Sequence, residues 1–184
     1  MPKKWIIITV LVIAIGAALV QPIMMTLTKR HSPYEEIAYD QNDLAITVAY
    51  CRPYMKDRVI FGELVPFGEV WRTGANEATT IELSQDVTVA GEPLPAGRYA
   101  LFTIPGENEW TMIFKNKADQ WGAFDYDAAE DALRVDVAAE HAESSAPMEQ
   151  FTIRLDEAEN GADLNFAWEK TYVSVPIRLG SGGD

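Results

Sequence analysis

The residue types best suited to chemistry gather in the nine-residue run Trp71–Thr79, whose sequence is WRTGANEAT. A guanidinium, an amide, a carboxylate and hydroxyls stand here within a few residues of an indole. Gly74 and Asn76 accept backbone angles that most residues avoid, and no strand-like alternation begins before Thr79. We therefore predict a structured loop that leads into a strand and ties its polar groups to one another or turns them toward a ligand.

The candidate ligand-binding set extends this loop with basic and aromatic residues from its surroundings. The guanidinium group of arginine can bind a carboxylate or phosphate group through two parallel hydrogen bonds, and aromatic rings can stack on sugar rings. In an acidic domain, arginines beside a tryptophan-bearing loop favour a small anionic or glycan ligand. The set consists of Arg52, Arg58, Trp71, Arg72, Asn76, Glu77, Thr79, Trp121 and Tyr126.

A structural role for the same loop is the first alternative. Asn76 would then cap the loop, and Trp71 would plug one end of the domain. Because an unpaired charge in a folded loop is costly, we expect Arg72 and Glu77 to be linked, directly or through Asn76 and the backbone of residues 74–75.

An enzyme is the second alternative, and its most concrete form is an envelope hydrolase that uses Glu77 with Arg72 as an electrostatic stabiliser. A paired-carboxylate hydrolase needs two acids about 5–9.5 Å apart. Glu69, Glu77 and Glu82 are candidates by sequence, but no spacing rule selects a pair. The sequence therefore leaves open whether the protein is an enzyme.

Nucleophiles, metals and cofactors have little support in the sequence. With only His31 in a linker and His141 in a loop, a Ser-His or Cys-His pair is not expected, and neither is a zinc site. Cys51 is the single cysteine and is expected to be a buried, small apolar residue. No Asp-x-Asp-x-Asp-Gly calcium loop is present. We predict no metal and no cofactor.

Charge divides the chain into two parts. Residues 31–184 carry all 28 Asp and Glu against eleven Lys and Arg, hence a net charge of −17. The other four basic residues, Lys3, Lys4, Lys29 and Arg30, precede them. An acidic domain of this kind is repelled by nucleic acid and by anionic headgroups, so no nucleic-acid partner is expected.

The start of the chain predicts a membrane segment over residues 5–27. Its first sixteen residues carry no charge and are nearly all apolar. A helix of this length rises about 34 Å, which is enough to cross a hydrocarbon core of about 30 Å. Lys3 and Lys4 favour a cytoplasmic N-terminus. We therefore expect a single-pass signal-anchor in a bacterial inner membrane, with the globular part on the extracytoplasmic side.

A cleaved signal peptide is the alternative to the anchor, and it would leave a secreted or periplasmic protein. The small residues that a signal peptidase needs occur at residues 14–18. They lie inside the apolar run rather than after it. Their position favours the uncleaved anchor.

The domain organisation follows from these patterns. We expect an anchor or signal segment (1–28), a polar linker (29–42), a β-sandwich domain (43–179) and a tail (180–184). Period-two alternation, with ten prolines and twelve glycines, indicates an all-β body, an antiparallel sandwich of about nine strands. Strands are expected at residues 44–50, 79–83, 86–90, 98–104, 110–115, 133–139, 151–155, 164–168 and 173–177, with a short apolar stretch at 59–61.

Residues 65–79 resemble the signature of DUF2911, a bacterial domain of unknown function. The flanks agree with the resemblance at residues 50–53, 58–62, 94–102, 120–122, 126 and 168–169, and it extends over residues 32–178. One departure is Cys51, where the family commonly has a serine or another small residue. The resemblance implies a secreted or envelope protein, and it supplies no reaction.

Overall fold

Eleven antiparallel strands form the domain in the computed structural model, which describes residues 30–118, 122–123, 126–142 and 144–180. They are β1 (Tyr34–Gln41), β2 (Leu44–Cys51), β3 (Thr79–Leu83), β4 (Val87–Val89), β5 (Glu92–Leu94), β6 (Gly97–Pro105), β7 (Glu109–Lys115), β8 (Asp131–His141), β9 (Met148–Ala158), β10 (Gly161–Glu169) and β11 (Thr171–Leu179). A 3₁₀ turn, η1 (Ala128–Glu130), precedes β8.

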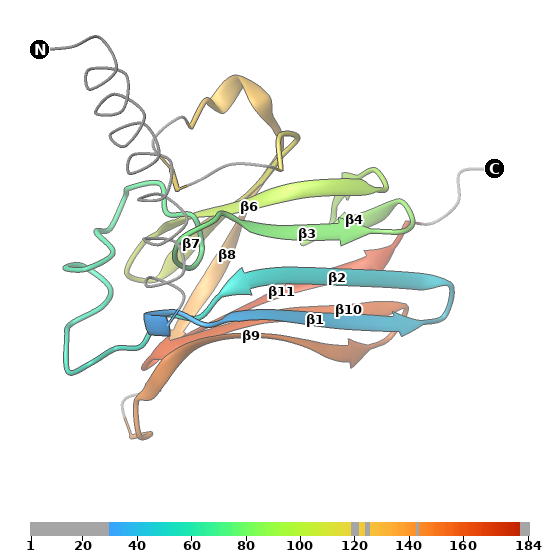
Figure 1. The fold of residues 1–184 in the computed structure, drawn as a ribbon. Helices are drawn as coiled ribbons and strands as arrows, with labels where there is room; N and C mark the ends of the chain where they lie inside the picture. Colours follow the sequence, from blue (N-terminus) through green and yellow to red (C-terminus); the bar gives the residue numbers. More distant parts are fainter. Residues whose placement is uncertain (1–29, 119–121, 124–125, 143, 181–184) are drawn as a thin grey trace, which may run out of the picture.

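The strands form one continuous hydrogen-bonded path. Neighbours follow the order β1-β2-β3-β6-β7-β8-β11-β10-β9, and the short hairpin β4-β5 attaches to β11. The two edge strands of this path, β1 and β9, lie against each other, so the sheet is nearly closed and barrel-like (Figure 1). The prediction of an all-β antiparallel fold is confirmed. The predicted sandwich of about nine strands is corrected to eleven strands in a nearly closed sheet.

Three local predictions differ from the structure. Residues 34–41, expected to belong to the linker, form β1, whose side chains are mostly exposed and therefore give little apolar alternation. Residues 92–94, expected to be loop, form β5, where Pro93 is tolerated in a short strand that pairs only with β4. The apolar stretch at 59–61 forms no strand, and its Phe61 makes only an isolated bridge with Val65.

The interior is filled by the alternate residues that the sequence pattern identified. On β11, for example, Val173, Val175 and Ile177 are at most 2% exposed. A second, smaller apolar cluster lies around Phe102 and Ile113, and Tyr126 packs against it. On β8 the alternate residues Arg134, Asp136 and Glu140 are exposed, as expected for a strand with one buried face.

The seam between β1 and β9 is closed at one end by side chains and by the chain leaving β2. The Tyr50 hydroxyl donates to Glu35 (2.6 Å) and accepts from the backbone N–H of Ile153 (2.9 Å). The backbone N–H of Phe151 donates to the Pro53 carbonyl (2.9 Å). Burial, followed by the hydrogen bond to Glu35, raises the pKa of Tyr50, which keeps the hydroxyl a donor. Residues 52–55 are thereby fixed against β9.

Between β2 and β3 the chain runs through residues 52–78 without forming a named strand. This long connection is held to the sheet by Trp71, whose backbone exchanges two hydrogen bonds with Thr103 of β6 (2.7 and 2.9 Å). Figure 1 shows the connection at the end of the sheets where the described chain begins. It carries most of the candidate site.

The predicted membrane segment lies outside the described residues, as do Trp121 and residues 181–184. Across the part of the chain that the structure describes, no helix combines the length and apolar character needed to cross a membrane.

Neighbouring positions on β9 provide a test of this strand assignment. Ile153 is 1% exposed, so Ile153→Ala should lower the free energy of unfolding by about 2–5 kcal/mol. The Arg154 side chain is 61% exposed, so Arg154→Ala should change it by at most about 0.5 kcal/mol. Urea unfolding of both variants measures the difference, and equal losses would show that the face assignment is wrong.

Candidate functional site

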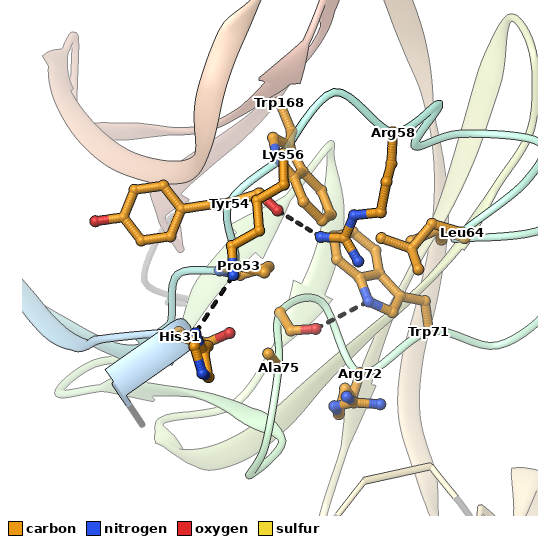
Figure 2. Close-up of a pocket in the computed structure, with 13 residues that line it drawn as sticks. His31, Pro53, Tyr54, Lys56, Arg58, Leu64, Trp71, Arg72, Ala75 and Trp168 are labelled. Atoms are coloured by element: carbon orange, nitrogen blue, oxygen red, sulfur yellow. Dashed lines mark hydrogen bonds between the residues drawn. The ribbon is translucent and has the colours of Figure 1, made fainter. Parts of the chain in front are cut away.

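A pocket of about 320 Å³ opens where residues 53–58 pass the loop 71–75 and the C-terminal end of β10 (Figure 2). Its lining includes four basic side chains: His31, Lys56, Arg58 and Arg72. Among the described residues, no Asp or Glu lines it. In a domain with a net charge of −17, this concentration of positive charge is a local exception.

Arg72 is the most unusual of these groups. Its Nε atom is buried and has no hydrogen-bond partner among the described residues. Burial lowers the pKa of the Arg72 guanidinium from its ordinary value, and Cys51 partly offsets the change. An arginine stays charged in spite of such a shift. The pocket therefore holds a cation with a buried donor that the described part of the protein leaves unsatisfied.

Arg58 and Lys56 are positioned by their own loop. Arg58 donates from Nε to the Met55 carbonyl (2.9 Å) and from Nη2 to the Tyr54 carbonyl (2.6 Å), which fixes the guanidinium at the pocket (Figure 2). Lys56 Nζ lies 3.3 Å from His31 Nδ1, a contact in which a neutral imidazole accepts. Within the described ranges, neither Arg58 nor Lys56 forms an ion pair with a carboxylate.

Two tryptophans close the inner side of the pocket. The rings of Trp71 and Trp168 stack with centroids 5.9 Å apart, and Trp71 also meets Phe61, Trp110 and Phe151 edge-on. The Trp71 indole N–H donates to the Gly74 carbonyl (3.0 Å). Trp71 is 8% exposed and Trp168 is 2% exposed, so both belong mainly to the core.

The backbone of the loop adopts the conformations that its glycine and asparagine suggested. Asn76 has φ = 60°, and Gly74 has φ = +153°. A Cβ atom at Gly74 would lie 2.9 Å from the Cys51 carbonyl oxygen and 3.2 Å from Thr79 Oγ1. Glycine is therefore required there, because the loop passes directly against the end of β2. The predicted structured loop is confirmed.

Several predicted site residues serve the fold instead of the pocket. Arg52 forms an ion pair with Glu35 (3.1 Å) and donates to the Phe151 carbonyl (3.2 Å), so it fastens the β1–β9 seam. Thr79 Oγ1 donates to the Thr73 carbonyl (2.6 Å) inside the loop.

Tyr126 lies with the second apolar cluster, away from the pocket residues. Its hydroxyl donates to Asp131 (2.6 Å) and accepts from Arg134, and its ring lies 5.5 Å from that of Phe102. Burial, strengthened by the bond to Asp131, raises the pKa of Tyr126 to about 12. Trp121 lies outside the described residues.

The expected Arg72–Glu77 pair is not formed between the described side chains. Glu77 Oε2 instead accepts from the Cys51 thiol (3.5 Å), and Asn76 accepts a backbone hydrogen bond from Gly122 (3.2 Å). The Asn76 side-chain nitrogen is buried, and no hydrogen-bond partner for it lies in the described part of the chain. Cys51 is buried, as predicted.

The carboxylates considered for hydrolysis do not meet at the pocket. Glu69 and Glu82 are exposed, Glu77 is half-buried, and none of the three lines the pocket. In the described part of the chain, no group of three or more His, Cys, Asp and Glu is placed to hold a metal ion.

Of the predicted set, Arg58, Trp71 and Arg72 line this pocket together, and the pocket also includes Lys56 and His31, which were not in that set. Neither of these carries a motif. His31 precedes β1, and only the return of β2 beside β1 brings it to residues 52–56. Trp168 was interpreted as core, which it is, and it also lines the pocket.

The family comparison covers this whole site except His31. Residues 32–177 match the family described as protein of unknown function (DUF2911). The chain belongs to this family. No curated protein and no solved structure matches the chain. The DUF2911 segment contains Lys56, Arg58, Arg72 and both tryptophans, so the pocket is a feature of the family domain in this chain.

The close approach at Gly74 can be tested by adding one methyl group. Gly74→Ala should lower the free energy of unfolding by about 1–3 kcal/mol, because the new Cβ meets the Cys51 carbonyl. Gly68→Ala is the matched control, since Gly68 also has positive φ (+76°) but open space around its Cβ position. Thermal unfolding compares them, and an equal or larger loss at Gly68 would contradict the close packing at Gly74.

Proposed function

We propose that this DUF2911 domain is a binding module for a small oxyanion, such as a phosphate or carboxylate group, held in the basic pocket. The observation that carries the proposal is the buried Nε–H of Arg72, for which the described residues supply no hydrogen-bond acceptor. A buried donor without an acceptor costs about 1–3 kcal/mol, and more when it is charged. An oxyanion in the pocket would accept this hydrogen bond and offset that cost.

The surroundings of Arg72 support the same chemistry. Arg58 and Lys56 add two cations to the pocket, and no described carboxylate competes for them there. Because Arg58 is already held by two carbonyls, little of its conformational freedom remains to be lost on binding. A volume of about 320 Å³ lies at the small end of the usual range for ligand sites.

A glycan and a hydrolytic reaction have less support from this geometry. Trp71 and Trp168 expose little of their rings, so they offer a sugar only a small stacking surface. Glu77, the residue that the hydrolase alternative uses, does not line the pocket. Binding of an anion without turnover is therefore the function that the site supports best.

We further propose that the domain is tethered to the extracytoplasmic side of the inner membrane through residues 5–27. The support is the apolar run in the sequence and the basic residues before it. On this account the full chain stays with the membrane fraction after a carbonate wash. Release into the soluble fraction, or recovery of a mature chain that begins near Ala17, would show a cleaved signal peptide instead.

Anion binding can be measured on the full-length protein in an uncharged maltoside detergent. Titration with inorganic phosphate and pyrophosphate, followed by calorimetry and by tryptophan fluorescence, should show saturable binding to one site. Arg72→Met should weaken binding at least tenfold, since a hydrogen bond from a charged group contributes about 1.5–3 kcal/mol. The variant should keep or gain stability, because it removes a half-buried charge that pairs with no described carboxylate.

Arg154→Gln is the control, because it removes an equal charge from the outer face of β9. Its affinity should match that of the parent protein. Equal weakening by both variants would indicate a nonspecific effect of charge. Loss of stability in Arg72→Met with no change in binding would show that Arg72 is structural.

A further inference from the structure

The exposed large apolar residues of the described part gather at the pocket end of the domain. They are Tyr34 (55% exposed), Val59 (48%), Leu64 (45%) and Phe67 (38%). Three of them belong to the connection between β2 and β3, and Leu64 also lines the pocket. Figure 1 shows that this connection and the start of β1 lie at the same end of the sheets.

Hydrogen bonds within the connection between β2 and β3 set the direction of Leu64. The backbone N–H of Val65 donates to the Ile60 carbonyl (2.8 Å), and the backbone N–H of Gly62 donates to the Val65 carbonyl (2.9 Å). Ile60 and Val65 point into the core, where they are 0% and 5% exposed. The intervening Leu64 is consequently directed away from it.

Charge at this end differs from that of the domain as a whole. Lys56, Arg58 and Arg72 line the pocket, while the carboxylates of the same connection, Asp57, Glu63, Glu69 and Glu77, lie outside its lining. An anionic surface would meet attraction only at the pocket and repulsion elsewhere. This pattern suits one phosphate group that enters the pocket better than diffuse binding to a charged surface.

Chain length limits how far the pocket can lie from a bilayer. His31 lines the pocket, and the apolar segment predicted from the sequence ends at Leu27. Four residues span at most about 14 Å when fully extended. If residues 5–27 cross the membrane, the pocket must therefore open close to the headgroup layer.

We propose that this end of the domain rests on the bilayer, with the phosphate of a glycerophospholipid headgroup bound in the pocket by Arg72, Arg58 and Lys56. Three exposed apolar side chains then enter the membrane interface beside the bound headgroup: Leu64, Val59 and Phe67. Their removal from water stabilises the contact with the bilayer. This inference rests on the proposed anion site and names the source of the anion.

The depth of Leu64 in the bilayer tests directly whether this end of the domain rests on the membrane. The full chain, carrying Cys51→Ser and Leu64→Cys with a spin label, is placed in phosphatidylglycerol–phosphatidylcholine nanodiscs. Oxygen concentrates in lipid, so it should relax the spin label at Leu64→Cys more strongly than a water-soluble nickel chelate does. The matched control is a label at Glu159→Cys, an exposed turn position between β9 and β10, which should show the reverse. Equal aqueous exposure at both sites would overturn the proposal.

The occupant of the pocket is tested separately. Inorganic phosphate should bind at least tenfold more weakly to the protein in nanodiscs than in maltoside, because headgroups fill the pocket. Arg72→Met should shift the Leu64 label toward water. Unchanged phosphate affinity in nanodiscs, or an unchanged label depth in Arg72→Met, would show that no headgroup occupies the site.

The two proposals fail in different ways. If phosphate binds in maltoside but the Leu64 label stays aqueous, the anion site stands and the headgroup assignment is wrong. If phosphate does not bind in maltoside, the anion site itself is wrong, whatever the position of the label.

Discussion

The packing of Trp71 into the aromatic core is the interaction on which the rest of the site depends. Its ring stacks on Trp168 and meets Phe61, Trp110 and Phe151 edge-on. Its backbone is bonded to β6, and its indole N–H holds the Gly74 carbonyl. Arg72, the next residue, therefore has no freedom to swing its backbone toward solvent. A cation is kept half-buried because the tryptophan before it is in the core.

A second constraint brings the other side of the pocket into place. The Tyr50 hydroxyl and Arg52 tie the end of β2 to β9, and this leads residues 53–58 across the open end of the sheet. Lys56 and Arg58 reach the pocket on that path. The contacts that close the β1–β9 seam therefore also bring Lys56 and Arg58 to the pocket, where they join Arg72.

The sequence predicted the parts of this arrangement that depend on local pattern. Alternation located most strands, as at Val173, Val175 and Ile177, and Gly74 with Asn76 indicated the special loop. Strand β1 was missed because an exposed edge strand needs no apolar alternation. A direct Arg72–Glu77 pair is not formed between the described side chains, where Glu77 accepts a hydrogen bond from Cys51. His31 and Lys56 could not be predicted, because only tertiary closure of the seam brings them together.

The most direct test of the central claim is the position of a bound oxyanion. Crystals of the protein grown with millimolar selenate, a tetrahedral analogue of phosphate, would reveal the anion by its anomalous scattering. The account predicts a peak in the pocket within about 3.5 Å of Arg72 Nε, close to Arg58 and Lys56. An empty pocket, with Arg72 Nε bonded to a protein acceptor such as Glu77, would contradict it.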